Sequence, residues 1–295
     1  MTPIRHRPLP APGSRRSVVF LCAVLVAALL AGCGGQGSHS AEAAAGAGHQ
    51  RGLPSAHVHG VAVNPGDGLV YLATHDGLFR YDAAGPTRVG PVIDLMGFTV
   101  AGPDTFYASG HPGPGVDLPD PVGLLRSTDA GKTWTPLSMQ GRSDFHALVA
   151  SGGGVVGYDG VLRTSRDGTT WRELPAPVSP HSLAASPDGT VLLATTEEGL
   201  RRSADAGASW ATVASAPLLL VVGWAGGDTV TGVTPDGTVA VSTDAGATWR
   251  ERGRVDGAPQ ALGASIAKSG GVRVLVVTDT AVLDSADGGV SFGKL

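Results

Sequence analysis

Residues 127–134 read Ser127-Thr-Asp129-Ala-Gly131-Lys-Thr133-Trp134, and this short signature recurs four more times along the chain. The further copies occupy residues 165–171, 203–210, 242–249 and 285–292, with Phe292 in place of the tryptophan in the last copy. Their first serines are 38, 38, 39 and 43 residues apart. A period near forty with a tight turn in every unit is typical of a repeated four-stranded blade. The repeats therefore predict a β-propeller.

The signature is a turn motif with a structural task. Its Asp and Ser side chains accept hydrogen bonds from backbone N–H groups, its glycine adopts a positive φ angle, and its aromatic ring packs between neighbouring sheets. We therefore interpret these Asp boxes as scaffold. Their aspartates are not candidate catalytic groups: Asp129, Asp167, Asp205, Asp244 and Asp287.

Apolar and alternating runs before the boxes predict the number of blades. Innermost strands are expected at residues 59–65, 97–100, 146–150, 181–187, 220–224 and 261–265. Second strands are expected at residues 69–74, 105–109, 155–158, 191–195, 229–233 and 272–278. Residues 77–85 match residues 123–131 in frame and represent a decayed first copy. We predict an all-β fold, a six-bladed β-propeller with Asp-box repeats. How residues 290–295 complete the last blade stays open.

The N-terminal region has the features of a lipoprotein leader. Four arginines without an acid precede an apolar stretch over residues 18–31, which is shorter than the roughly 20 residues of a membrane span and fits a secretory signal. The sequence Leu30-Ala31-Gly32-Cys33 resembles the bacterial lipobox, which implies that Cys33 carries the lipid. We expect a signal peptide at 1–32, a flexible tether at 33–55 and the propeller at 56–295. The protein would then be anchored at the extracytoplasmic face of the bacterial cytoplasmic membrane.

Charge excludes one class of partner. The chain has 21 basic and 25 acidic residues, and four of the basic residues are the leader arginines. Nucleic-acid binding needs a basic surface, and none is visible in this composition. We therefore expect that the protein binds no nucleic acid. We also expect a monomer that contacts the membrane through its lipid.

The histidines of the predicted propeller gather on one face. Propeller topology brings together the start of each innermost strand and the turn between the second and third strands, opposite the Asp boxes. All six histidines of this region map there: His57, His59, His75, His111, His146 and His181. Asp76, Asp159 and Glu197 lie in turns of the same face, and Tyr158 precedes Asp159. We expect a polar ligand to bind to these histidines and Tyr158 at the mouth of the central channel.

Two chemistries fit such a face. Imidazoles from several blades suit a divalent transition metal, with His59, His75, His146 and His181 as the expected ligands. Alternatively, Asp76, Asp159 and Glu197 would supply the pair of carboxyl groups that glycoside hydrolysis uses. The residues by themselves leave both alternatives open, and a metal could also support hydrolysis.

A family resemblance accompanies these patterns. The Asp boxes resemble those of the BNR-repeat superfamily, which includes sialidases. Five segments look like a family of bacterial exported proteins described as glycosyl hydrolase-like or exo-sialidase-like: His57-Val-His59-Gly-Val-Ala-Val, Ala73-Thr74-His75-Asp76-Gly77-Leu78-Phe79, Met96-Gly97-Phe98-Thr99-Val100, Ser109-Gly110-His111-Pro112 and Asp144-Phe145-His146-Ala147-Leu148. The resemblance implies a propeller that binds or cleaves a glycan.

Sialidase activity itself is not expected. Sialidases hold the substrate carboxylate with three arginines, whereas Arg142 is the one arginine expected near the channel mouth. Tyr158 with Glu197 or Glu198 could imitate the Tyr and Glu pair of sialidases, but the arginine triad is missing. The resemblance also reaches photosystem-assembly and sorting-receptor propellers that bind proteins. A scaffold for an exported protein partner, without catalysis, is therefore a further alternative.

Overall fold

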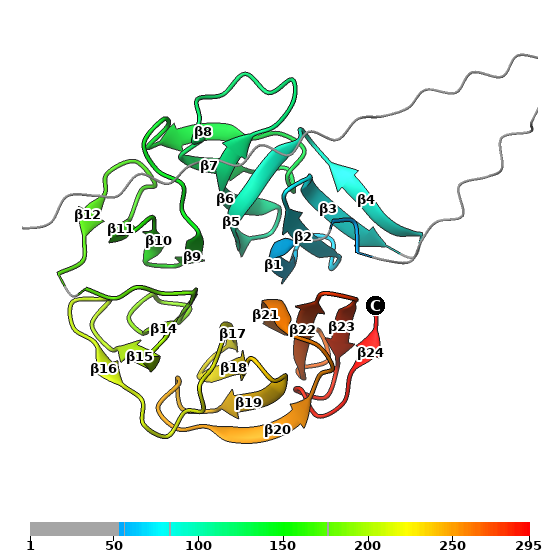
Figure 1. Ribbon diagram of the computed structural model, residues 1–295, viewed down its shortest axis with the longest axis vertical. Helices are drawn as coiled ribbons and strands as arrows, with labels where there is room; N and C mark the ends of the chain where they lie inside the picture. Colours follow the sequence, from blue (N-terminus) through cyan, green and yellow to red (C-terminus); the bar gives the residue numbers. More distant parts are fainter. Residues whose placement is uncertain (1–52, 56, 83, 176) are drawn as a thin grey trace, which may run out of the picture. The chain divides into compact units, whose positions relative to one another are not determined.

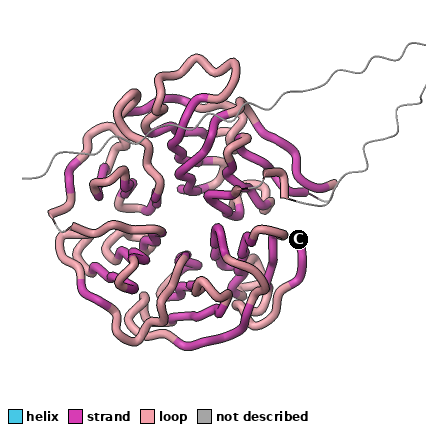
Figure 2. The backbone as a smooth tube through the Cα atoms, in the orientation of Figure 1, coloured by secondary structure: helices cyan, strands magenta, loops and turns pink. Residues whose placement is uncertain are grey.

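The computed structural model describes residues 53–55, 57–82, 84–175 and 177–295. The described residues belong to one compact unit, residues 48–295, which contains six four-stranded sheets. The sheets are arranged as blades around a central axis (Figure 1), and Figure 2 shows strands and loops throughout them. Within the described part of the chain, no helix is long and apolar enough to span a membrane. The predicted leader and Cys33, which is expected to carry the lipid, lie outside the described residues.

Each blade is an antiparallel meander of four strands consecutive in sequence. The innermost strands are β1 (Val58–Val63), β5 (Ile93–Gly102), β9 (Ala147–Ser151), β13 (Ser182–Ala185), β17 (Val221–Gly226) and β21 (Pro259–Ile266). The second strands are β2 (Val70–Thr74), β6 (Thr105–Pro112), β10 (Gly154–Tyr158), β14 (Leu192–Thr196), β18 (Thr229–Val233) and β22 (Val272–Thr278). The third strands are β3 (Gly77–Asp82), β7 (Leu124–Ser127), β11 (Leu162–Ser165), β15 (Gly199–Ser203), β19 (Thr238–Ser242) and β23 (Val282–Ser285). The outer strands are β4 (Gly85–Val89), β8 (Thr135–Ser138), β12 (Arg172–Glu173), β16 (Ala211–Thr212), β20 (Arg250–Arg254) and β24 (Gly293–Lys294).

The predicted fold class is confirmed: the protein is an all-β, six-bladed propeller. The decayed copy in the first blade, residues 77–85, forms β3 and the turn that leads into β4. The other blades carry their Asp boxes at this turn. The question left open for the last blade has a simple answer, because β24 pairs with β23 within the same blade. Every described sheet is therefore made from one continuous segment.

The core consists of six hydrophobic clusters, each between two adjacent blades. One cluster joins Tyr71 and Leu78 of the first blade to Phe106 and Leu125 of the second. Equivalent clusters follow around the ring, and the sixth joins Val61 of β1 to Leu275 of β22. Because apolar area is buried between blades, no blade has a complete core without its neighbours.

The Asp boxes form the turns that the sequence predicts. In the fourth blade, Ser203 Oγ donates to Asp205 Oδ1 at 2.7 Å and accepts from Gly207 N at 2.8 Å. Asp205 in turn accepts from Ser209 N at 2.8 Å and from Ser209 Oγ at 2.6 Å. These hydrogen bonds, above all the one from the Ser209 hydroxyl, lower the pKa of Asp205 to about 2. The carboxylate thus stays charged and organises the turn.

The boxes also dock each blade onto the preceding one. A methyl group on Gly207 would lie 2.6 Å from Leu174 Cδ1, and one on Gly246 would lie 2.7 Å from Leu193 Cδ1. Both glycines also have positive φ angles, 87° and 79°. The aromatic residue at the end of each box packs into the same interblade cluster, as Trp171 does against Phe145 with ring centroids 4.8 Å apart. The positive φ angles therefore favour glycine at both positions, and any side chain there would also displace a leucine of the preceding blade.

The ring closes by side-chain packing between the first and last blades. Val58 N donates to Gln260 Oε1 at 3.0 Å across this junction. Gly263 lies against Val61, where an added methyl group would be 2.6 Å from the carbonyl oxygen. On the outside, a groove of about 460 Å³ at this junction is lined by residues that include Leu53, Tyr81 and Leu295.

Removing a box serine is expected to destabilise the propeller. Ser203 is 1% exposed, and Ser203→Ala leaves the N–H of Gly207 without its acceptor. An unsatisfied buried donor costs about 1–3 kcal/mol, so the free energy of unfolding should fall by about that amount. Chemical denaturation of the full-length protein measures this change. Ser269→Ala, in an exposed turn, is the matched control; an equal loss in both variants would contradict the role of the box.

Candidate functional site

The channel mouth contains a cavity of about 740 Å³. Its lining includes most of the predicted ligand-binding residues, namely His57, His59, His146, Tyr158 and His181, and one predicted catalytic residue, Asp159. A smaller cavity of about 110 Å³ along the inner strands shares His59, His146 and His181 with it. The predicted residues His75 and His111 contact members of this lining, as described below. The structure therefore gathers histidines from several blades around one polar space.

Three β-bulges give side chains to this cavity. In β1 the pairing skips from Val58 to Gly60, which leaves His59 out of the ladder. The equivalent skips in β5 and β21 leave out Met96 and Gln260. His59, Met96 and Gln260 all line the cavity. A bulge reorients the side chain of the extra residue, so the innermost strands of three successive blades present a residue at the same level of the channel mouth.

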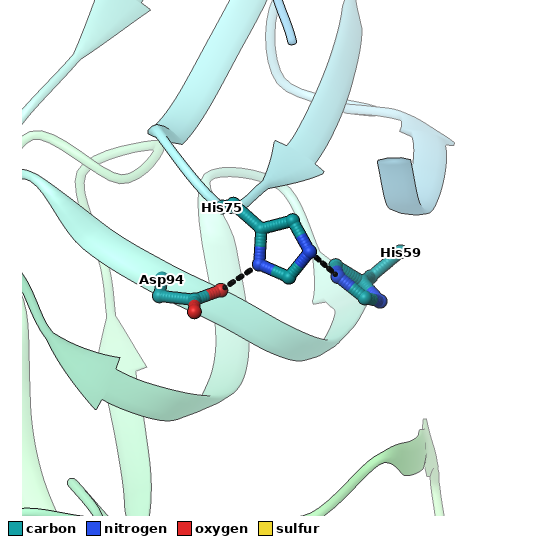
Figure 3. Close-up of side chains that lie close together, drawn as sticks. All are labelled: His59, His75 and Asp94. Atoms are coloured by element: carbon teal, nitrogen blue, oxygen red, sulfur yellow. Dashed lines mark hydrogen bonds and ion pairs between the residues drawn. The ribbon is translucent and has the colours of Figure 1, made fainter. Parts of the chain in front are cut away.

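His59, His75 and Asp94 form a chain of close polar contacts (Figure 3). His75 Nδ1 lies 2.7 Å from Asp94 Oδ1, and His75 Nε2 lies 3.2 Å from His59 Nε2. Since a carboxylate only accepts, the proton of neutral His75 is on Nδ1 and Nε2 carries a lone pair. The ligand atoms of these three residues lie within 4.8 Å of one another. Asp94 therefore fixes both the orientation and the tautomer of His75.

His57 completes a group of three imidazoles. Its ring centroid is 4.6 Å from that of His59 and 5.4 Å from that of His75. Burial, together with the neighbouring imidazoles of His57 and His75, lowers the pKa of His59 from 6.5 to about 4. Burial also lowers the pKa of His181. His59 and His181 are therefore neutral at pH 7, the form in which an imidazole binds a metal.

Asp144 connects two further histidines. Its Oδ2 lies 2.7 Å from His146 Nε2 and 3.1 Å from His111 Nε2, while His111 Nδ1 lies 2.6 Å from Asp120 Oδ1. The hydrogen bond to Asp120 raises the pKa of His111, and the charge of Asp144 acts in the same direction. Both ring nitrogens of His111 can donate at once only in the imidazolium form. Asp144 Oδ1 is buried and has no hydrogen-bond partner among the described residues.

The three predicted catalytic acids lie in different surroundings. Asp159 lines the cavity, but it accepts from Ser143 Oγ at 2.5 Å and is paired with Arg163. Asp76 and Glu197 are exposed turn residues that are not part of the cavity lining. The structure therefore does not bring these three carboxyl groups together around the cavity.

Sequence reasoning missed several residues of the site. It did not identify Asp94, Met96 or Gln260 as site residues, although Met96 lies in a segment quoted for its family resemblance. Asp94 and Met96 alternate with the buried Ile93 and Leu95, a period-2 pattern that indicates a strand with one half-exposed face. This alternation lies before residue 97, where the predicted innermost strand begins, so the prediction did not include it. A bulge, by contrast, has no distinct sequence pattern here.

The comparisons with known proteins show the fold. The chain matches no protein-family model, and no curated protein matches it. A GH74 enzyme from Niastella koreensis has a similar structure, with a TM-score of 0.55, 17% identity and coverage of 81% of this chain and 37% of the enzyme. An ancestral GH74 enzyme has a TM-score of 0.52 and 11% identity over 77% of this chain and 36% of that one. The extracellular domain of a hybrid two-component system protein from B. thetaiotaomicron has a TM-score of 0.51 and 12% identity over 79% of this chain and 38% of that one. The chain thus spans little more than a third of the length of each of these structures, and at these identities the similarity shows the β-propeller fold alone.

The contacts of His111 predict a pH-dependent contribution to stability. Because the folded-state pKa is raised above 6.5, this contribution is complete below pH 6.5 and is lost as the pH rises through the folded-state value. The difference in unfolding free energy between the wild type and His111→Gln should therefore be larger at pH 6 than at pH 9. Chemical denaturation at both pH values measures it, with Gln140→Asn as a control outside the network. An equal difference at the two pH values would show that His111 is not charged in this way.

Proposed function

We propose that the protein binds a transition-metal ion at the channel mouth, with His59 and His75 as ligands and His57 as the third imidazole. The observation that carries this proposal is the 3.2 Å distance between His59 Nε2 and His75 Nε2. Two nitrogens that each lie about 2.05 Å from a tetrahedral ion are about 3.3 Å apart. The two side chains thus already have the spacing of two ligands of one ion.

Asp94 has a positioning role in this proposal. A metal-binding histidine commonly donates its other ring N–H to a carboxylate, which orients the ring and increases the basicity of the ligand nitrogen. The contact between His75 Nδ1 and Asp94 Oδ1, 2.7 Å long, has this arrangement. Asp94 therefore acts through His75 and does not need to contact the ion.

The cavity beside the three imidazoles supports binding of a small polar ligand next to the ion. It is lined by Asp144, His146, Tyr158 and Asp159. These groups offer donors, acceptors and negative charge, and the acidic surface favours the approach of a cation. His146 and His181, which the sequence also predicts as metal ligands, are candidates for contacts to this second molecule.

Metal binding is tested on full-length protein purified in detergent. We expect one zinc or copper ion per chain, and we expect His59→Ala or His75→Ala to abolish stoichiometric binding. Asp94→Asn should lower the affinity by about 10- to 100-fold, because it removes an orienting partner and not a ligand. Metal analysis and competition with a chromophoric chelator measure these effects.

His181→Ala is the matched control, since His181 lines the same cavity but is not part of the His59, His75 and Asp94 contacts. It should retain the metal. Equal loss in all four variants would indicate a general disturbance of the cavity, and wild-type protein without metal after reconstitution would refute the proposal.

A glycan is the alternative ligand for this cavity. The cavity volume of about 740 Å³ accommodates a sugar, and two carboxyl groups, those of Asp144 and Asp159, line it. If the protein takes up no metal, the same preparations incubated with aryl glycosides decide between hydrolysis and binding without catalysis. Hydrolysis that persists in Asp144→Asn and Asp159→Asn would place the reaction elsewhere. An exported protein partner is the remaining alternative, detected by membrane pull-down.

For the location of the protein, the proposal rests on the leader sequence. Residues 1–32 are proposed as a lipoprotein signal and Cys33 as the lipidated residue, which would hold the propeller at the extracytoplasmic face of the bacterial cytoplasmic membrane. We expect Cys33→Ser to shift the protein from the membrane fraction to the soluble fraction or to leave it unprocessed, whereas Cys22→Ser should have no effect. Membrane fractionation and the mass of the mature protein measure this. If the Cys33→Ser variant stays in the membrane fraction and has the same mature mass as the wild type, Cys33 does not carry a lipid anchor.

A further inference from the structure

We propose that the ion at the channel mouth is copper and that the thioether of Met96 is one of its ligands in the Cu(I) state. This inference rests on the proposed metal-binding function and specifies which ion the site selects.

Met96 is the structural counterpart of His59 in the next blade. Each is the extra residue of a bulge in an innermost strand, β5 and β1 respectively, and both line the same cavity. The two strands approach closely just beyond the bulges, because a methyl group on Gly60 would be 3.1 Å from Phe98 Cβ. The two bulged side chains therefore project from adjacent strands at the same level of the channel mouth.

The alternation of side chains along β5 also places Met96 on the side of the strand away from the core. Ile93 and Leu95 are 1% exposed and belong to the core, whereas Asp94 and Met96 are half-buried. Asp94 contacts His75 from this face. The next half-buried side chain along the strand is that of Met96, which lines the channel-mouth cavity together with His57 and His59.

Met96 is also distinguished by its surroundings. The only other methionine among the described residues, Met139, packs in the hydrophobic cluster between the second and third blades. Both cysteines of the chain, Cys22 and Cys33, lie outside the described residues. Within the described residues, Met96 therefore brings the one sulfur atom to the cavity. A methionine needed only for packing would be expected on the core side of the strand with Ile93 and Leu95.

The composition of the ligand set selects the metal. Imidazole nitrogens bind both zinc and copper, whereas a thioether is a soft ligand that favours Cu(I). Zinc sites are commonly completed by histidine, cysteine or a carboxylate. Two or three imidazoles with one thioether therefore match copper better than zinc, and the thioether should matter most for the reduced ion.

The test compares the effect of one substitution on the affinities for two metals, Cu(I) and Zn²⁺. Full-length Met96→Leu keeps the size and apolar character of the side chain but removes the sulfur. We expect its Cu(I) affinity to fall by about ten-fold or more, while its Zn²⁺ affinity stays within about two-fold of the wild type. Competition with chromophoric chelators, under anaerobic conditions for Cu(I), gives both affinities. Copper K-edge absorption should detect a sulfur neighbour in the wild type that is missing from the variant.

Met139→Leu is the matched control and should leave both affinities unchanged. Unchanged Cu(I) binding in Met96→Leu, or an equal loss for Cu(I) and Zn²⁺, would overturn the role of the thioether. Wild-type protein that binds Zn²⁺ but not Cu(I) would overturn the copper assignment and leave the metal site intact. Wild-type protein that binds neither ion would overturn the proposed function as well, so the two failures are distinguishable.

Discussion

The contact between each Asp box and the preceding blade is the constraint on which the ring depends. At Gly207 and Gly246 the backbone comes so close to a leucine of the neighbouring blade that an added methyl group would force the leucine side chain to shift. The buried serine of the box holds the turn in the shape that permits this approach. Because the apolar core lies between blades, this spacing also sets the distance between the innermost strands. The central channel is therefore as wide as the docking of the boxes allows.

A rim of fixed width makes the polar site possible. His59, Met96 and Gln260 come from three blades, and each leaves its ladder at an equivalent bulge. Rigid strands hold these residues at one level, and Asp94 orients His75 beside them at 2.7 Å. The site is thus built on the sheets themselves, which position groups more accurately than loops do. The six-bladed propeller supplies the frame, and the bulges and turns at one end of the channel bring the histidines together.

Much of this fold could be predicted from the sequence, because its main signal is repeated. The boxes and the strands before them have local patterns, and five copies reinforce one another. The site was predicted less completely. His59 and His75 could be placed at the channel mouth from topology, but their contact with Asp94 depends on where β5 begins and bulges. Asp159 was predicted as a catalytic carboxyl group, and its pairing with Arg163 arises from strand register, which a turn pattern does not reveal.

The manner of ring closure has a consequence for how the chain can be rearranged. Each sheet is made from one continuous segment, and in the described residues the first and last blades meet through side chains such as Val61 and Leu275. Leu53 and Leu295 line the same groove at this junction. A circular permutation of the propeller that linked residue 295 to residue 53 and opened the chain between any other pair of blades would cut no sheet. The sheets therefore do not fix the blade at which the chain begins, provided that the order of the blades around the ring is kept.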